Sequence, residues 1–345
     1  MNTLRFPLVV ACLAVLLGCV TIAQAAELPR VRLVATGGTI SNRTGSRLTA
    51  GELVATIPDV QRVARTEFEQ FANVSSTEMT LDQWLALSRR LNELFAKDAE
   101  LGGLVVTSGT DTLEELAYFL HLTVRDDRPV VVVGSMRNPS TVGFEGAANL
   151  LEAFRVAADP EARGKGVLVV LNDEINSARE ATKTDALRLQ TFQSRPAGVL
   201  GVVDADRVVF YRSTLKRHTS RSEFDVSTIV ALPRVDVLTT YQGASGDLIK
   251  AAVELGAKGI VVAGAGAGST TTAQDEAIAS AADNGAIVVV TTRTGSGRVA
   301  APPRRERSAP IAGEDLQPVK ARVLLMLALT RTSDPAEIQR MFTQY

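Results

Sequence analysis

Residues 101–136 read LGGLVVTSGTDTLEELAYFLHLTVRDDRPVVVVGSM and predict one complete strand–helix–strand unit. Gly103–Thr107 and Pro129–Gly134 are short, valine-rich runs, which are typical of strands buried on both faces of a parallel sheet. Between them, Thr112–Val124 has the spacing of an amphipathic helix. Its apolar face comprises Leu113, Leu116, Ala117 and Leu120. The opposite face carries Glu114, Tyr118 and His121, so we expect this helix to pack on a sheet by one side.

The same alternation extends over most of the chain and predicts the α/β class. Further strands are expected at Val31–Ala35, Val167–Leu171, Val235–Thr239, Gly259–Ala263 and Ala286–Thr291. Further helices are expected at Leu81–Ala96, Gly143–Ala158, Gly246–Leu255, Thr271–Asp283 and Gln317–Thr330.

The alternation stops between Arg195 and Arg234, which indicates a boundary between two domains. Gly201–Tyr211 resembles a hairpin, and Arg212–Ser222 is polar and basic, with its cations expected in solvent. The chain has 345 residues, more than the about 250–300 that one core usually supports. We therefore expect an N-terminal α/β domain at 26–211, a linker at 212–233 and a smaller α/β domain at 234–345.

The first 25 residues have the composition of an export leader. Arg5 precedes an apolar run, and Ala23-Gln24-Ala25 fits a cleavage site, which predicts a periplasmic or secreted protein. An alternative is that Leu16-Leu17-Gly18-Cys19 is a lipobox and that lipidated Cys19 anchors the chain to a membrane. Cys12 and Cys19 are the only cysteines, so a chain cleaved after Ala25 would have no disulfide and no thiol nucleophile.

The charge balance argues against nucleic acid as a partner. The sequence has 37 basic and 38 acidic residues in scattered positions, for a net charge of −1. No field of one sign would gather a polyanion or an anionic membrane, so a small molecule is the expected ligand. His121 and His218 are the only histidines and lie far apart in sequence, so we expect each to be structural or simply exposed.

Hydroxyl, carboxylate and amine side chains follow several of the expected strands. Thr36–Ile40 and Ser108–Thr112 each come directly after a strand, where ligands of open parallel sheets bind. Ser75–Met79 and Glu180–Thr184 add further polar groups. Taken singly, each segment also has an ordinary explanation as a turn, a helix cap or a solvated lysine.

Taken together, six collinear segments resemble the type II bacterial L-asparaginase/glutaminase family over nearly the whole mature length. They are Ala35–Ile40, Ser108–Glu115, Val133–Arg137, Leu171–Glu174, Ala181–Thr184 and Lys320–Leu325. The resemblance implies a large flavodoxin-like parallel-sheet domain, a smaller C-terminal α/β domain and a homotetramer. It implies an amidohydrolase that releases ammonia from L-asparagine and gives L-aspartate through a threonine acyl-enzyme, without metal or other cofactor.

The resemblance also assigns roles to individual residues. Thr39 would be the nucleophile, and Thr110, Asp111 and Lys183 would handle its proton. Substrate would be bound by Ser76, Thr77, Asp111 and Ser135. Two alternatives remain: a glutaminase-asparaginase of broad specificity, and a periplasmic amino-acid binding protein without turnover.

The chain departs from the family pattern after the first threonine. The family usually has a tyrosine in the loop there, whereas Ser41–Arg47 has none, so the loop either closes differently or uses another donor, such as Ser41, Arg43 or Arg47. A separate alternative, dinucleotide binding, comes from Gly264–Ser269, a glycine-rich run after a strand. That run has Ser269 where the third glycine of the fingerprint should stand, which argues against a nucleotide site.

Overall fold

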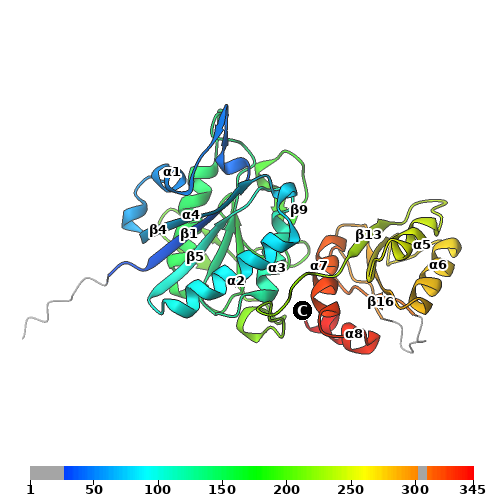
Figure 1. The fold of residues 1–345 in the computed structure, drawn as a ribbon. Coiled ribbons are helices and arrows are strands. Elements are labelled where there is room, and N and C mark those ends of the chain that lie inside the picture. The colour runs from blue at the N-terminus through cyan, green and yellow to red at the C-terminus, as the bar shows by residue number, and fades with distance from the viewer. Residues whose placement is uncertain (1–26, 302–308) are drawn as a thin grey trace, which may run out of the picture.

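The computed structural model describes residues 27–301 and 309–345 and contains two α/β domains, each built on its own sheet (Figure 1). The expected leader, the possible lipobox with Cys19 and most of the loop Ala301–Arg307 lie outside the described residues. Within the described residues, no helix is both long and apolar enough to span a bilayer.

The larger sheet has the strand order β12-β11-β8-β7-β6-β5-β1-β4. Its parallel strands are β1 (Arg30–Gly37), β4 (Arg65–Val74), β5 (Leu101–Thr107), β6 (Val130–Val133) and β7 (Val167–Leu171). Numbered in chain order these strands run 2-1-3-4-5, the flavodoxin-like order, which confirms the expected fold. The sheet is mixed, however, because antiparallel strands extend one edge. These are β8 (Glu174–Ser177), β11 (Gly201–Val203) and β12 (Val208–Phe210), and the last two form the expected hairpin.

Helices cover both faces of this sheet. One face packs against α1 (Ala50–Ala55) and α4 (Gly146–Ala158), and the other against α2 (Leu81–Lys97) and α3 (Leu113–Thr123). Successive strand residues alternate between the two cores: Leu33 and Val105 face α4, whereas Val34 and Leu104 face α2 and α3. Burial on both faces explains why these strands have nearly continuous apolar sequences.

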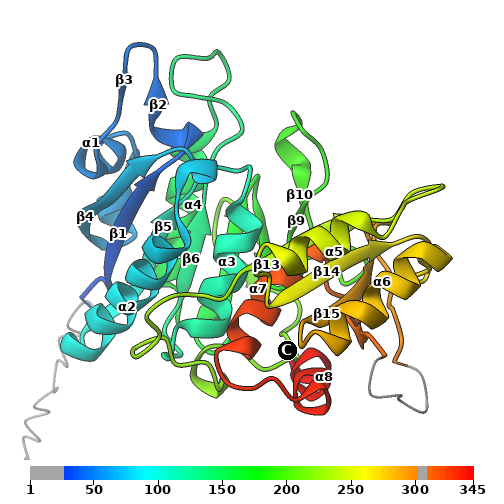
Figure 2. The same ribbon diagram turned by 45° about the vertical axis from the view of Figure 1, so that its right-hand side comes forward.

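The smaller sheet is parallel throughout and has the order β13-β14-β15-β16. Its strands are β13 (Val235–Thr239), β14 (Gly259–Gly264), β15 (Ile287–Thr292) and β16 (Ile311–Ala312). On one side lie α5 (Asp247–Glu254) and α6 (Thr272–Asp283), and on the other lie α7 (Pro318–Leu329) and α8 (Pro335–Gln344). Helix α7 also packs on α3, so one continuous core joins the two domains (Figure 2).

This contact corrects the prediction for α3. Glu114, Tyr118 and His121 do not face solvent, and all three are buried. The sheet covers one side of α3 and α7 covers the other, which the sequence of α3 alone cannot reveal. His121 also lies beside His218, with ring centroids 5.0 Å apart, and both are buried, as expected for structural roles.

The basic linker segment is also less exposed than its composition suggests. Arg212 donates to Glu180 at 2.6 Å, and Arg217 donates to Gln344 at 2.9 Å. Lys216 donates to the carbonyl of Thr343 at the end of α8. These cations therefore bind the linker to its neighbours while their side chains stay partly exposed, so the predicted solvated basic face is also a set of contacts within the protein.

Candidate active site

The predicted nucleophile segment lies where the strand order reverses, at the carboxyl ends of β1 and β5. The two strands are cross-linked there: Thr36 Oγ1 donates to the carbonyl of Thr107 at 2.6 Å, and Thr36 N donates to Thr107 Oγ1 at 3.0 Å. Both threonines are buried, so these bonds fix the two strand ends relative to each other.

Thr39 and Thr110 follow two glycines whose backbones touch. A Cβ atom on Gly38 would lie 2.3 Å from the backbone nitrogen of Gly109, a distance that only glycine permits. Gly38 also has φ 91°, which disfavours any larger residue. Thr39, half-buried at the start of a 3-10 turn (Thr39–Ser41), and the buried Thr110 therefore each follow directly on the point where the two backbones meet.

Lys183 reaches the same place from a distant part of the chain. It lies on β9 (Thr182–Lys183), which pairs with β10 (Phe192–Gln193) in a short hairpin. Its Nζ donates to Thr110 Oγ1 at 3.1 Å and to Asp111 Oδ1 at 2.7 Å. The structure therefore brings together three predicted residues that are up to 73 positions apart.

These three side chains differ in their access to solvent. Thr110 is 5% exposed, and the Lys183 side chain is 15% exposed. The Asp111 side chain is 71% exposed and faces a cleft of about 350 Å³, lined also by Lys183, Thr184, Asp185 and Ala186. An amine bound to a carboxylate at the cleft and to a hydroxyl beneath it is positioned to move a proton to or from that hydroxyl.

The predicted substrate-binding residues differ in their burial and in their hydrogen bonds. Ser76 is half-buried, and its Oγ accepts a hydrogen bond from Thr112 N at 3.4 Å. Thr77 is exposed on the same turn, and no contact ties it to the other site residues in the described structure. Ser135 follows β6 and is fully buried, with its Oγ donating to the Arg137 carbonyl at 2.6 Å. A contribution of Ser135 would therefore come from its backbone.

Known protein families match both domains of the chain. The family described as "Asparaginase, N-terminal" matches residues 30–216, and the "Glutaminase/Asparaginase C-terminal domain" matches residues 234–342. The chain belongs to the asparaginase family. This confirms the resemblance read from the sequence, and the chain is an amidohydrolase of the asparaginase type.

Several relatives of this asparaginase match nearly its whole length. L-asparaginase 2 of Bacillus subtilis is 44% identical over 92% of this chain and 87% of its own. Glutaminase-asparaginase of Pseudomonas fluorescens is 38% identical over 92% and 91%. The probable periplasmic L-asparaginase of Haemophilus influenzae is 37% identical over 94% and 96%. A solved probable cytoplasmic L-asparaginase from Campylobacter jejuni is 42% identical, with TM-score 0.88 over 92% of this chain and all of its own.

The loop that lacks the family's tyrosine forms a small hairpin of β2 (Asn42–Arg43) and β3 (Ser46–Arg47) in this asparaginase. Of the three proposed replacements, Ser41 donates to the Gly38 carbonyl at 3.0 Å, and Arg43 contacts Ser46 and Glu52 away from the cleft. Arg47 Nη2 donates to Ser75 Oγ at 3.3 Å. Its buried Nη1 has no hydrogen-bond partner in the part of the chain that the structure describes.

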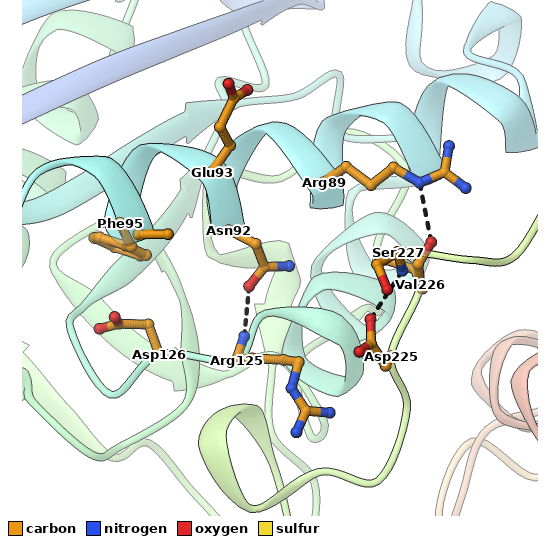
Figure 3. A pocket seen from close by; sticks show the side chains of 10 residues that line it. Arg89, Asn92, Glu93, Phe95, Arg125, Asp126, Asp225, Val226 and Ser227 are labelled. Atoms are coloured by element: carbon orange, nitrogen blue, oxygen red, sulfur yellow. Dashed lines mark hydrogen bonds between the residues drawn. The ribbon is translucent and has the colours of Figure 1, made fainter.

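A larger cavity of about 520 Å³, shown in Figure 3, shares no lining residue with the cleft at Asp111. It is bounded by α2, by the segment after α3 and by residues 225–227 of the linker. Arg89 in its wall donates to the Val226 carbonyl at 2.9 Å, and Arg125 N donates to Asn92 at 2.7 Å, as Figure 3 shows. It contains none of the predicted site residues, so size alone does not locate the active site of this asparaginase.

The glycine-rich turn after β14 is explained by its own packing. A Cβ on Gly264 would lie 2.6 Å from the backbone of Gly268, and Ala265 N donates to the Ser269 carbonyl at 2.8 Å. The turn thus folds back on itself, which accounts for its glycines without a nucleotide. Among the described residues, no group of three or more His, Cys, Asp or Glu is arranged to hold a metal ion.

Two charged residues near the site had no role in the sequence analysis. Glu114 Oε1 accepts a hydrogen bond from the backbone nitrogen of Lys183 at 3.3 Å, and Lys320 lies buried 3.9 Å from Glu114 Oε2. Both stand within segments that carried the family resemblance. The feature of the sequence that could have pointed to Lys320 is that it is a single lysine in the apolar run that forms α7, VKARVLLMLAL.

Proposed function

We propose that this asparaginase hydrolyses the side-chain amide of L-asparagine, with Thr39 as nucleophile and with Thr110, Lys183 and Asp111 as its proton-handling group. The observation that carries this proposal is the pair of hydrogen bonds from Lys183 Nζ, to Thr110 Oγ1 at 3.1 Å and to Asp111 Oδ1 at 2.7 Å. A neutral lysine at this position can take a proton through the Thr110 hydroxyl.

The reaction then follows two acyl transfers. Thr39 Oγ attacks the amide carbon, its proton passes to the Thr110–Lys183 pair, and the proton is returned to the leaving nitrogen as ammonia departs. Water attacks the resulting ester and gives its proton to the same pair, which returns it to Thr39 Oγ as the ester bond breaks and L-aspartate is released. Backbone N–H groups near Thr110 and Ser135, at adjacent strand ends, would donate to the oxyanion.

Substrate binding requires groups for an ammonium and a carboxylate. Asp111 is exposed to the cleft and would pair with the substrate's ammonium. Ser76 would donate to its carboxylate, and Arg47, bonded to neighbouring Ser75, would supply a positive charge there. Thr77 would contribute only at the rim of the site, because it is exposed.

A broader glutaminase-asparaginase activity is the second candidate. It is supported by the glutaminase-asparaginase of Pseudomonas fluorescens, which is 38% identical to this chain. Discrimination between the two amides depends on contacts to a chain one methylene longer, which is worth about 1–3 kcal/mol in a closely fitting site.

We also propose the domain division at 26–211 and 234–345, which agrees with the two family matches. Export to the periplasm is supported by the leader composition and by the periplasmic relative, although another relative is described as cytoplasmic. Assembly as a homotetramer is proposed from family membership, and light scattering of the purified protein would test it.

Ammonia release from a panel of asparagine, glutamine and D-asparagine tests the proposed function. Purified protein should release ammonia from asparagine, and Thr39→Ala and Lys183→Met should each lower kcat by at least about 1,000-fold, as removal of a nucleophile or its activating base does in other acyl-transfer enzymes. Lys250→Met, an exposed change on α5, should leave kcat unaltered. Binding of aspartate without ammonia release from any amide would instead support an amino-acid binding protein.

A further inference from the structure

Lys320 is a buried cation with no place in the reaction described so far. It lies on α7 of the C-terminal domain and is 1% exposed. Its Nζ donates to the carbonyls of Ala178 at 3.0 Å and Arg179 at 2.9 Å, and also to the carbonyl of Ala181. All three carbonyls belong to the N-terminal domain, in the segment that leads into Lys183.

Glu114 links this cation to the catalytic lysine. It lies in the first turn of α3, and its Oε2 is 3.9 Å from Lys320 Nζ. Its Oε1 accepts the backbone N–H of Lys183 at 3.3 Å. Glu114 is 9% exposed, so its charge interacts with Lys320 and Lys183 with little screening by water.

A second ion pair fastens the same segment to the C-terminal domain. Arg179 donates to Asp315 through both terminal nitrogens, at 2.8 and 2.7 Å, and its side chain is 4% exposed. The segment before β9 is therefore held at Arg179 and at three carbonyls by side chains from the other domain. Displacement of that segment would move Lys183 away from Thr110.

Resting on the proposed function, we infer that Lys320 and Glu114 are positioning residues, through which the C-terminal domain sets the place and protonation of Lys183. Stability alone does not explain why a lysine is buried at this position of α7. Removing an ammonium from water is costly, and an apolar side chain of similar volume would fill the space as well or better. Burial lowers the pKa of Lys320 to about 8, while the Glu114 carboxylate raises it.

The charged groups around Lys320 set the expected effects of substitution. Besides Glu114, they are Arg179, Glu180 and Asp315. Lys183 contacts Asp111 through its Nζ and Glu114 through its backbone nitrogen. Neutralising Lys320 leaves the Glu114 carboxylate without its counter-charge, which adds net negative charge near the site. Neutralising Glu114 leaves Lys320 as an uncompensated cation, which adds net positive charge there.

Lys320→Met, Glu114→Gln and the double variant test this inference, with exposed Lys250→Met as the matched control. Lys320→Met should lower kcat by about 100-fold, the size of effect expected when a reacting group shifts by about 1 Å, with KM changed much less. Glu114→Gln keeps an oxygen that can accept the Lys183 N–H, so its loss in kcat should be smaller. Circular dichroism would show that the variants are folded.

The pH dependence of kcat distinguishes positioning from simple stabilisation. Lys320→Met removes a positive charge near the site and Glu114→Gln removes a negative one, so the acidic limb should move to higher pH in the first variant and to lower pH in the second. The double variant should restore the limb to near its normal position, because both charges are gone. A destabilised but otherwise normal site would not give shifts of opposite sign.

A readout without turnover separates this inference from the proposed function. The pH at which Lys183 becomes reactive toward an amine-acylating reagent, followed by mass spectrometry, should shift in the same two directions. If the wild-type protein releases no ammonia but the labelling shifts appear, the proposed function fails and the positioning role stands. If kcat, limb and labelling in both single variants match the wild type, the positioning role is overturned.

Discussion

Arg47 lies in the loop that lacks the family's tyrosine, and we propose that it helps to bind the substrate. It donates to Ser75, next to Ser76, for which we propose a role in substrate binding, whereas Arg43 on the same hairpin pairs with exposed groups. Arg47→Met should raise KM for asparagine about 10- to 100-fold, because a hydrogen bond to a charged group contributes about 1.5–3 kcal/mol, with a smaller effect on kcat. Arg43→Met should change neither. Steady-state kinetics of both variants would show this, and an unchanged KM in Arg47→Met would remove Arg47 from the substrate site.

Glu152 is a buried carboxyl group whose raised pKa makes the stability of the protein depend on pH. Burial raises its pKa to about 8 and neighbouring Asp173 adds to the effect. In the folded protein the group stays neutral to about pH 8, whereas in the unfolded chain it ionises near its ordinary value of 4.5. Its favourable contribution is complete below pH 4.5 and is lost as pH rises through 8.

Glu152→Gln should therefore have a larger free energy of unfolding than the wild type at pH 8. The difference between the two proteins should be about 2–4 kcal/mol more in favour of the variant at pH 8 than at pH 5. Gln can still accept the Asp173 N–H that Glu152 accepts at 3.2 Å. Urea unfolding at both pH values measures the change, with exposed Glu161→Gln as control. A variant less stable than the wild type at pH 8 would show that the ionised carboxylate is needed.

At the scale of elements, the contact between α3 and the linker depends on two neutral histidines. Burial, together with nearby Arg221, lowers the pKa of His218 to about 4. Arg221 donates to its Nε2, so that nitrogen must be unprotonated. Burial likewise lowers the pKa of His121, whose Nδ1 accepts from Val167 N at 3.1 Å. Folding therefore favours the uncharged rings.

As pH falls from 6.5 to 4, the unfolded chain binds a proton at His218 that the folded protein does not, so the wild type should lose stability over this range. The expected share of His218 is about 2–3 kcal/mol. His218→Gln should have a shallower decline in free energy of unfolding between pH 6.5 and 4.5, measured by urea titration. Equal slopes in both proteins would mean that His218 is charged in the fold.

The elements also show where sequence reasoning works. Strands such as β5 and β7 were predicted because both faces are buried and their sequences are nearly all apolar. Strand β4 was missed because RTEFEQFANV contains charged residues, as expected for a strand at the edge of the sheet. Strand β8 was missed although Asn172-Asp173, with φ 55° and 64°, forms the two-residue hairpin turn that these residues favour.

At the scale of the whole molecule, the residues of the candidate site could be predicted from the sequence, but the contacts that hold them in place could not. Thr39 and Thr110 follow β1 and β5, two parallel neighbours whose carboxyl ends lie at the same edge, so sheet topology brings them together. Lys183 instead comes from the separate hairpin of β9 and β10, which follows antiparallel β8. The link from Lys320 to the carbonyl of Ala181 spans 139 positions and two domains, and no local pattern encodes it. It depends on α7 packing on α3, which is a tertiary contact.

The ion pair between Arg179 and Asp315 tests this dependence of one domain on the other. The Arg179 guanidinium holds the pKa of Asp315 at about 2, below the ordinary 3.8, so the pair contributes stability above pH 3.8 and loses it as pH falls through 2. Asp315→Asn leaves Arg179 buried without its counter-charge. Because the Asp315 side chain is 45% exposed, the expected loss in free energy of unfolding at pH 7 is moderate, about 1–3 kcal/mol.

Asp315→Asn should also lower kcat, because the loosened segment carries Lys183, whereas KM should change little because Ser76 and Asp111 lie on other segments. Glu337→Gln is the matched control, since it breaks a surface pair with Arg340 that should contribute less than about 1 kcal/mol. Urea unfolding and ammonia release would be measured on both. Asp315→Asn with reduced stability but wild-type kcat would mean that the domains are joined without any effect on the catalytic lysine.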